Sequence, residues 1–434
     1  METVPIFALI ATSLVIGAAV VAAFFFSLRK QSEAKPELRQ DPGKSPNKKK
    51  HASNAISRKS HPRPSAVKEQ VKRHHPLDLN TLKGHTDTVT GLCFSDDARS
   101  LATACSDGVV RIFKLDNATS KSFKMLRISV PSGGHPMAVS FSEDLSIAVA
   151  SQELTGTSLY MFGEGKPQQV NEGNQLLKLP LPDVKWVHHK IHDDRAVISL
   201  VATKSTYGTG DGTTIMASCS DGTDVKIWHG ISGKLVGNVD TNQLKNHTAC
   251  LSPNGRFIAA AAFTADVKVW EIVYSKDGSV KEVSKVMQLK GHKSAVNWLC
   301  FTPDAEGIIT ISKDGTLRVW NINVRYHLDE DPKTLKVFQI PLRDSNGVVL
   351  PYDRLSLSPD GKILAATRGS TLQWLCADTG TVIDTADQSH DGDITWIAWA
   401  PKPILAGDKE IMFMATASAD KKVKLWAAPS FPSS

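Results

Sequence analysis

Cysteine is scarce in this chain of 434 residues, with six copies at positions 93, 105, 219, 250, 300 and 376. No two of them form a C-x-x-C pair, and they are spread through apolar stretches such as NWLCF and LATACSD. A disulfide framework or a structural zinc site would need closely spaced cysteines, so the spacing disfavours both. The pattern indicates buried free thiols in a reducing compartment, which means the cytosol or a cytosol-facing domain.

Catalytic motifs are also missing. The sequence contains no G-x-S-x-G, no Walker loop, no G-x-G-x-x-G and no H-E-x-x-H. The glycine-rich stretch GTGDGTT at 208–214 lies between two predicted strands, whereas a phosphate-binding loop opens a helix. We therefore predict that the protein is not an enzyme and uses no cofactor, metal or small-molecule substrate.

Excess positive charge is missing from most of the chain, although the net charge is +7. Residues 29–75 hold 14 Lys and Arg against 4 Asp and Glu, a net of +10, which leaves −2 for residues 76–434 once Glu2 is counted. A large domain that is nearly neutral argues against a nucleic-acid surface covering that domain.

Charge of either sign is missing between Val4 and Leu28. A helix of this length rises about 1.5 Å per residue and spans a hydrocarbon core of roughly 30 Å. A cleaved signal peptide is the alternative, but it usually has a basic start and an apolar core of about 7–15 residues. Here the start is not basic, and three Phe stand where small cleavage-site residues would be needed. Residues 1–28 are therefore predicted to be a retained transmembrane signal-anchor.

The flanks of this segment predict its orientation. Arg29 and Lys30 follow it directly, whereas only Glu2 and the terminus precede it. The positive-inside rule then places the rest of the chain in the cytosol. The glycosylation sequons at Asn117 and Asn246 would matter only in a lumen, so we expect them to be unused.

Large apolar residues are nearly absent from 29–75, which contains five prolines. Such a segment buries too little surface to offset its chain entropy, so a disordered linker is expected. A solvated tether with some attraction to anionic lipid is the favoured interpretation, and contact with the RNA backbone is the alternative. No aromatic residues are interleaved for stacking on bases. The basic side chains available for these contacts are Arg29, Lys30, Lys48, Lys49, Lys50, Arg58, Lys59, Lys72 and Arg73.

The remainder, 76–428, is built from approximate repeats. GHKSAVNWLCFTPDAEGIITISKDGTLRVW at 291–320 recurs in seven versions at a spacing of about forty residues, each reading as short strands with Gly/Asp turns. These repeats resemble the WD40 family, which implies an all-β, seven-bladed β-propeller. The last repeat stops at KKVKLW, so Leu77–Lys83 is predicted to supply its outer strand, and residues 429–434 form a short tail.

The WD40 resemblance also implies buried hydrogen-bonded tetrads, in which an Asp, a His, a hydroxyl and a Trp satisfy one another. We expect one tetrad of His292, Ser312, Asp314 and Trp320, and a second of His390, Ser418, Asp420 and Trp426. The first repeat keeps His85 and Asp107 but has Cys105 and Phe113, and the fourth has Asn242 where the His is expected. These two blades are predicted to be less rigid.

A histidine cluster at His188, His189 and His192, followed by Asp193 and Asp194, suggests a metal site. However, the third blade's first strand begins here, so one of these histidines is expected to be its tetrad member, and a structural role is favoured. A hydrolase with its site in the propeller channel stays open as a weaker alternative. It would need acidic or His residues that converge at the blade mouths and have perturbed pKa values.

A closer resemblance is carried by DTNQLKNHTACLSPNGRFIAAAAFTADVKVWEI, together with the plan of an N-terminal anchor, a basic linker and one propeller. This combination is similar to the transducin beta-like protein 2 family. The resemblance implies an endoplasmic reticulum membrane protein with a cytosolic propeller that associates with an ER-stress kinase and with the translation machinery, including RNA. We therefore predict a single-pass scaffold for protein–protein interactions, with an RNA- or ribosome-associated protein acting through the linker as the alternative.

Overall fold

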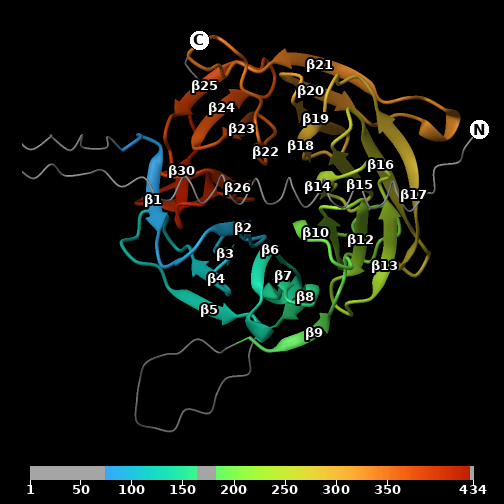
Figure 1. The fold of residues 1–434 in the computed structure, drawn as a ribbon, viewed down its shortest axis with the longest axis horizontal. Helices are drawn as coiled ribbons and strands as arrows, with labels where there is room; N and C mark the ends of the chain where they lie inside the picture. Colours follow the sequence, from blue (N-terminus) through green and yellow to red (C-terminus); the bar gives the residue numbers. More distant parts are fainter. Residues whose placement is uncertain (1–73, 164–181, 431–434) are drawn as a thin grey trace, which may run out of the picture. The chain divides into compact units, whose positions relative to one another are not determined.

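The computed structural model describes residues 74–163 and 182–430. The compact unit Val71–Ser434 contains seven four-stranded antiparallel sheets, which follow one another around a common centre (Figure 1). The predicted all-β, seven-bladed propeller is confirmed. The predicted anchor at 1–28 and the basic side chains of the predicted linker lie outside the described residues. Within 74–163 and 182–430, no helix is both long and apolar enough to cross a membrane.

Each blade is a meander whose first strand lies nearest the centre of the ring (Figure 1). The blades and the smaller elements have the following bounds: blade 1, β2 (Val89–Phe94), β3 (Ser100–Cys105), β4 (Val109–Lys114) and β5 (Met125–Ser129); blade 2, β6 (His135–Phe141), β7 (Ile147–Glu153), β8 (Gly156–Phe162) and β9 (Val184–His188); blade 3, β10 (Val197–Lys204), β11 (Thr214–Ser220), β12 (Asp224–His229) and β13 (Leu235–Asp240); blade 4, β14 (Asn246–Leu251), β15 (Phe257–Ala262), β16 (Val267–Tyr274) and β17 (Val280–Leu289); blade 5, β18 (Val296–Phe301), β19 (Gly307–Ser312), β20 (Thr316–Asn321) and β21 (Lys333–Gln339); blade 6, β22 (Arg354–Leu357), β23 (Ile363–Arg368), β24 (Thr371–Cys376) and β25 (Val382–Ala386); blade 7, β26 (Ile394–Trp399), β29 (Phe413–Ser418), β30 (Val423–Ala427) and β1 (Asp78–Leu82); a hairpin of β27 (Ile404–Ala406) and β28 (Lys409–Ile411); and 3-10 helices at Pro131–Gly133, Glu143–Leu145 and Tyr326–Leu328.

The second strand is fully buried in several blades. The six residues FIAAAA of β15 are all buried, and so are the six of β19 and of β29. These strands read as continuous apolar runs because a neighbouring blade covers each face of the sheet, as in other sheets that are packed on both sides. The outer strand β21 is mostly exposed by contrast. The core is therefore divided into clusters between blades, such as the one joining Phe257 of blade 4 to Leu299 and Trp320 of blade 5.

The N-terminal strand β1 closes the ring. It pairs antiparallel with β30, with Thr81 opposite Lys424, so the prediction that Leu77–Lys83 supplies the missing outer strand is confirmed. A salt bridge of 2.9 Å joins Lys424 Nζ to the buried carboxylate of Asp78. Ring closure pairs the first and last strands of the propeller and leaves few free strand edges.

Candidate functional site

Two segments of each blade meet at one face of the ring, which we call the mouth. One is the leading loop before the first strand, and the other is the inner turn between the second and third strands. In blade 5, His292 of the leading loop contacts Asp314 of the inner turn, with 3.0 Å between Nδ1 and Oδ2. His292 Nε2 lies 2.7 Å from the Thr310 hydroxyl, to which the indole N–H of Trp320 donates over 2.9 Å. This buried chain of bonds ties the leading loop to the inner turn.

The hydroxyl of this tetrad belongs to Thr310, and the prediction of Ser312 is wrong. Trp320 pairs across the ladder with Ile308, so Thr310 is its diagonal neighbour and Ser312 lies two residues farther along. At about 3.3 Å per residue, Ser312 is out of reach of the indole. Its hydroxyl instead donates to the carbonyl of Ser294 and accepts the N–H of Asp314, so it shapes the turn.

Blade 7 repeats this arrangement. His390 lies 3.0 Å from Asp420 and 2.7 Å from the Thr416 hydroxyl, and Trp426 donates to that hydroxyl over 2.8 Å. Thr416 therefore takes the place predicted for Ser418, whose hydroxyl donates to the carbonyl of Gly392. The same strand register explains both corrections, since Trp426 pairs with Met414.

Blade 3 has a tetrad that uses a histidine of the predicted cluster. His192 contacts Asp224 through Nδ1 and the Ser218 hydroxyl through Nε2 over 2.8 Å, and Trp228 donates to Ser218 over 2.9 Å. His188 stacks on the Trp228 ring, while His189 turns to Ser158 in blade 2. The three histidines therefore have separate partners, and the described residues contain no group of three or more His, Cys, Asp or Glu placed to hold a metal ion.

The carboxylates of these tetrads are held ionised. Burial opposes the charge on Asp314, but hydrogen bonds from Thr316, from the N–H of Lys293 and from His292 outweigh it and lower the pKa to about 2. The pKa of Asp224 is lowered to about 2 in the same way, against burial, by His192 and Ser220. Burial lowers the pKa of His292. A neutral imidazole can donate to Asp314 and accept from Thr310 at the same time.

The network in blade 1 is shorter. His85 contacts the Thr103 hydroxyl over 2.9 Å, but its buried Nδ1 has no hydrogen-bond partner, because Asp107 pairs with Arg111 instead, with 2.7 Å between Oδ2 and Nη2. The expected pairing of His85 with Asp107 is therefore wrong. Phe113 offers no N–H, so nothing donates to Thr103 from the tetrad's Trp position. Burial and the nearby Arg111 charge lower the pKa of His85 to about 4.

Blade 4 ties its leading loop down with a different residue. The side-chain amide of Gln243 donates to the Thr264 hydroxyl over 2.7 Å and to the carbonyl of Asp266 over 2.9 Å. Gln243 is buried, whereas Asn242 is exposed, so the prediction that placed Asn242 at the His position is wrong by one residue. Left-handed backbone conformations at Asn242 and Leu244, with φ of 47° and 63°, turn the Gln243 side chain inward.

A hollow of about 630 Å³ opens at the mouth over blades 4, 5 and 6. Its lining includes four cationic side chains from separate segments, Lys245, Lys313, Arg354 and Arg368, and one carboxylate, Asp353. Neutral and apolar residues complete the lining, Trp298 among them. The hydrolase alternative needs acidic or His residues that converge at the mouth and have perturbed pKa values. The hollow holds one carboxylate, Asp353, and one histidine, His247, whose pKa is lowered by burial, while its charge is mainly positive.

The cations of the hollow differ in how they are held. Arg368 pairs with Asp353 over 2.6 Å at the surface. Arg354 lies over the Trp298 ring, at 5.5 Å from the ring centroid, and its Nη1 donates to the carbonyl of Ile394, while its buried Nε has no hydrogen-bond partner. Burial lowers the pKa of Arg354, although the Asp353 and Asp393 charges oppose this. An anion that entered the hollow would meet a partly desolvated guanidinium, which interacts more strongly than an exposed one.

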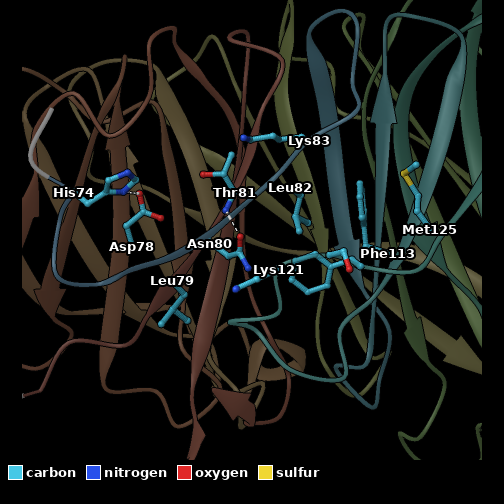
Figure 2. Close-up of a pocket in the computed structure, with 12 residues that line it drawn as sticks. His74, Asp78, Leu79, Asn80, Thr81, Leu82, Lys83, Phe113, Lys121 and Met125 are labelled. Carbon is cyan, nitrogen blue, oxygen red and sulfur yellow. Dashed lines mark hydrogen bonds and ion pairs between the residues drawn. The ribbon is translucent and has the colours of Figure 1, made fainter. Parts of the chain in front are cut away.

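A second hollow, of about 500 Å³, lies along the seam where the ring closes (Figure 2). It is bordered by the strand β1 and by Phe113, Lys121 and Met125 of blade 1. Here Asn80 donates from its side-chain amide to the carbonyls of Ala118 and Ser120, over 3.0 and 2.8 Å. These bonds fasten β1 to the neighbouring blade, so the polar groups of the seam serve ring closure.

All six cysteines lie within the described residues and are free thiols. Cys105 and Cys219 are buried, and the other four are half-buried. The prediction of dispersed free thiols in place of a disulfide framework is confirmed, with two of the thiols buried and four half-buried.

Comparisons with known proteins agree with this architecture. Residues 78–114, 283–321 and 380–427 match the family "WD domain, G-beta repeat". Transducin beta-like protein 2 of Mus musculus is 30% identical over 363 residues, which cover 83% of this chain and 75% of the mouse protein. The chain belongs to the transducin beta-like protein 2 family. The human member is 31% identical over 308 residues, covering 70% of this chain and 64% of the human protein.

Similarity also extends beyond the transducin beta-like protein 2 family. The guanine nucleotide-binding protein subunit beta of Zea mays is 22% identical over 360 residues, covering 81% of this chain and 84% of that protein. Membership of the transducin beta-like protein 2 family confirms the resemblance that the sequence shows to it. The stretch that carries the resemblance includes Thr241–Leu244, in which Gln243 anchors blade 4. WD40 propellers typically act as non-enzymatic scaffolds for protein–protein interaction, and the mouth described above is the surface that the tetrads hold in place.

Proposed function

We propose that this chain is a membrane-anchored scaffold that holds its propeller in the cytosol and gathers other proteins at the endoplasmic reticulum. The observation that carries the proposal is the propeller itself, in which buried tetrads fasten leading loops to inner turns and so present a rigid mouth. Loops fixed on a rigid scaffold are where proteins usually place binding residues.

The anchor in this proposal is the uncharged segment from Val4 to Leu28, which lies outside the described residues. Its length and the basic flank that follows support a single pass with the propeller on the cytosolic side. Membership of the transducin beta-like protein 2 family supports the ER address and partners that include an ER-stress kinase and the translation machinery.

The test is proximity labelling in cells with the labelling enzyme at the C-terminus, comparing the full chain with a version lacking 1–28. The full chain should label ER-surface and translation proteins, and the truncated chain should not. Equal labelling of the same soluble proteins by both would contradict the proposed anchor. As an orientation control, the sequons at Asn117 and Asn246 should carry no glycan that an endoglycosidase can remove.

RNA or ribosome binding through the linker is the second candidate, favoured by the net charge of +10 in 29–75. Phosphate contacts release counterions, so binding to an unstructured RNA should weaken steeply with salt. Replacing Lys48, Lys49 and Lys50 by Gln should lower the slope of log K against log salt by about 2, since single-stranded contacts contribute about 0.7 each. An unchanged slope in a filter-binding assay would exclude this cluster from RNA contact.

A further inference from the structure

Blade 4 presents two apolar side chains to solvent beside the cationic hollow. Leu244 is 77% exposed and Phe263 is 55% exposed. They lie close together, because the N–H of Phe263 donates to the carbonyl of Lys245 over 2.8 Å. The Phe263 ring meets the His247 ring edge-on, and Lys313 Nζ lies 5.6 Å from the Phe263 centroid. Phe263 therefore contacts two residues that line the hollow, and Leu244 is the chain neighbour of a third, Lys245.

The backbone conformation at Leu244 keeps its side chain exposed to solvent. Its φ of 63° lies in the left-handed region, which costs a non-glycine residue about 1–2 kcal/mol. The neighbouring Gln243 holds this conformation, because its buried side chain is bonded to Thr264 and to the carbonyl of Asp266. The surrounding structure thus enforces a strained backbone conformation at Leu244, whose side chain is exposed. Strain of this kind clusters at binding sites, which suggests a binding role for Leu244.

The surface also has positive charge that is not neutralised. Among the described residues, no carboxylate lies within 4.0 Å of Lys313 Nζ. Lys245 reaches Asp221 only at 3.7 Å, and its side chain is 59% exposed. Arg354 and Arg368 line the same hollow, and Arg368 is paired with Asp353. Exposed cations beside an apolar pair offer charge complementarity to a segment that carries carboxylates.

We propose that Leu244, Lys245, Phe263 and Lys313, with Arg354 and Arg368 in the hollow, form a docking surface for an extended acidic segment of a partner protein. The partner segment carries a large apolar side chain that packs on Leu244 and Phe263, and its carboxylates pair with the lysines and arginines. We call these six residues the blade-4 surface. The inference rests on the proposed scaffold function, whose partner class it specifies.

Protein is favoured over RNA as the occupant. A single-stranded nucleic acid needs successive aromatic platforms for its bases. Phe263 is the one aromatic residue among the exposed large apolar side chains of the described residues. Trp298 is already in contact with the Arg354 guanidinium and with the Trp396 ring, which meets it edge-on at 5.4 Å. An apolar pair beside separate cations instead matches a peptide with mixed side chains.

The experiment is to pan a random 12-residue peptide display library on the immobilised full chain and to measure the selected peptides by fluorescence anisotropy. Two variants test the surface: Leu244→Ala combined with Phe263→Ala, and Lys313→Glu. The matched controls are Leu328→Ala, at an exposed leucine of the 3-10 helix that follows blade 5's third strand, and Lys281→Glu, at an exposed lysine of β17. Thermal unfolding checks that every variant is folded.

The selected peptides should contain Asp or Glu together with a large apolar residue. Their affinity should fall about tenfold or more with either surface variant and change by less than about twofold with either control. Selection of basic peptides, no selection at all, or equal loss with the control variants would overturn the proposal. Binding of poly(U) is the last control. If poly(U) binds the full chain and its Leu244→Ala, Phe263→Ala variant with equal affinity but does not bind the Lys313→Glu variant, the surface recognises a polyanion and the proposal is overturned.

Proximity labelling separates this inference from the function on which it rests. If the full chain labels specific neighbours and the variant with both apolar substitutions labels the same ones, the scaffold stands and the blade-4 surface is wrong. If the unaltered full chain labels no specific neighbours, the scaffold itself is wrong.

Discussion

Blades 4 and 5 are adjacent, have the same four-strand meander and share one core cluster, yet they fasten the mouth differently. Blade 5 uses His292, Asp314, Thr310 and Trp320 in a buried chain of hydrogen bonds. Blade 4 uses one Gln243 side chain that reaches the inner turn directly. In both blades a buried polar link joins the leading loop to the inner turn. More than one residue type can therefore supply the link that holds the mouth.

The exposed side chains differ as well. In blade 5 the residue after the anchoring His292 is Lys293, an ordinary exposed cation. In blade 4 the residue after Gln243 is Leu244, held in a left-handed conformation and facing solvent. The altered anchor therefore coincides with an exposed apolar pair, which is the part of the mouth that we assign to partner binding.

The largest expected effect is at the shared hydroxyl of blade 5. Thr310→Val leaves a buried imidazole nitrogen and a buried indole N–H without partners, at about 1–3 kcal/mol each. We expect a loss of about 4 kcal/mol in the free energy of unfolding, measured by urea denaturation. Ser312→Ala is the matched control and should cost about 1 kcal/mol. Equal losses would restore Ser312 to the tetrad.

The next effect is a pH dependence in blade 1. The folded pKa of His85, about 4, lies below its ordinary value near 6.5, so the folded state binds fewer protons between these values. The stabilisation from neutral His85 is present above pH 6.5 and is lost as the pH falls through 4, by roughly 3 kcal/mol in total. The stability difference between the unaltered chain and His85→Gln should therefore shrink from pH 7 to pH 4. A difference that is constant with pH would contradict the buried, neutral His85.

A smaller effect is expected at the blade 4 anchor. Gln243→Ala removes two hydrogen bonds and leaves the Asp266 carbonyl and the Thr264 hydroxyl without this donor, so the free energy of unfolding should fall by about 2 kcal/mol. Asn242→Gly keeps the left-handed backbone available and should change it by about 0.5 kcal/mol or less. If Asn242→Gly were the more damaging of the two, Asn242 would be the anchor after all.

The smallest effect concerns the strained leucine. Asn tolerates the left-handed region better than Leu, so Leu244→Asn should raise the free energy of unfolding by about 0.5 kcal/mol while weakening peptide binding. Leu328→Asn, at another exposed leucine, should show no such gain. A loss of stability with Leu244→Asn would mean that Leu244 packs against the propeller and is not displayed for a partner.

The sequence predicts the propeller well because its signals are local. Blades 3, 5 and 7 each carry a His in the leading loop, an Asp at the inner turn and a Trp in the third strand, and the final KKVKLW lacks a partner that β1 then supplies. The hydroxyl of the tetrad is harder to predict. Thr310 and Ser312 are two residues apart and point to the same face of β19, so only the register between Ile308 and Trp320 decides between them.

Other parts of the candidate site could not be read from the sequence. Gln243 replaces Asn242 because two left-handed residues rotate the loop. In the letters TNQL, Asn242 is compatible with a left-handed conformation, but nothing signals the second one at Leu244. The cations of the hollow extend from Lys245 to Arg368 and come from segments of three blades. Only the packing of consecutive blades around the centre brings them together, so their convergence is a tertiary property with no local pattern.

We expect Gln243 to fasten the leading loop of blade 4 as firmly as the tetrad fastens that of blade 5. Two equivalent amides test it by hydrogen exchange in the full chain: the N–H of Phe263, which donates to Lys245, and the N–H of Lys313, which donates to Ala295. We predict that their protection factors agree to within about tenfold, and that Gln243→Ala lowers only that of Phe263. If the Phe263 amide of the unaltered chain exchanges as fast as an open loop while the Lys313 amide stays protected, Gln243 does not anchor the blade 4 mouth.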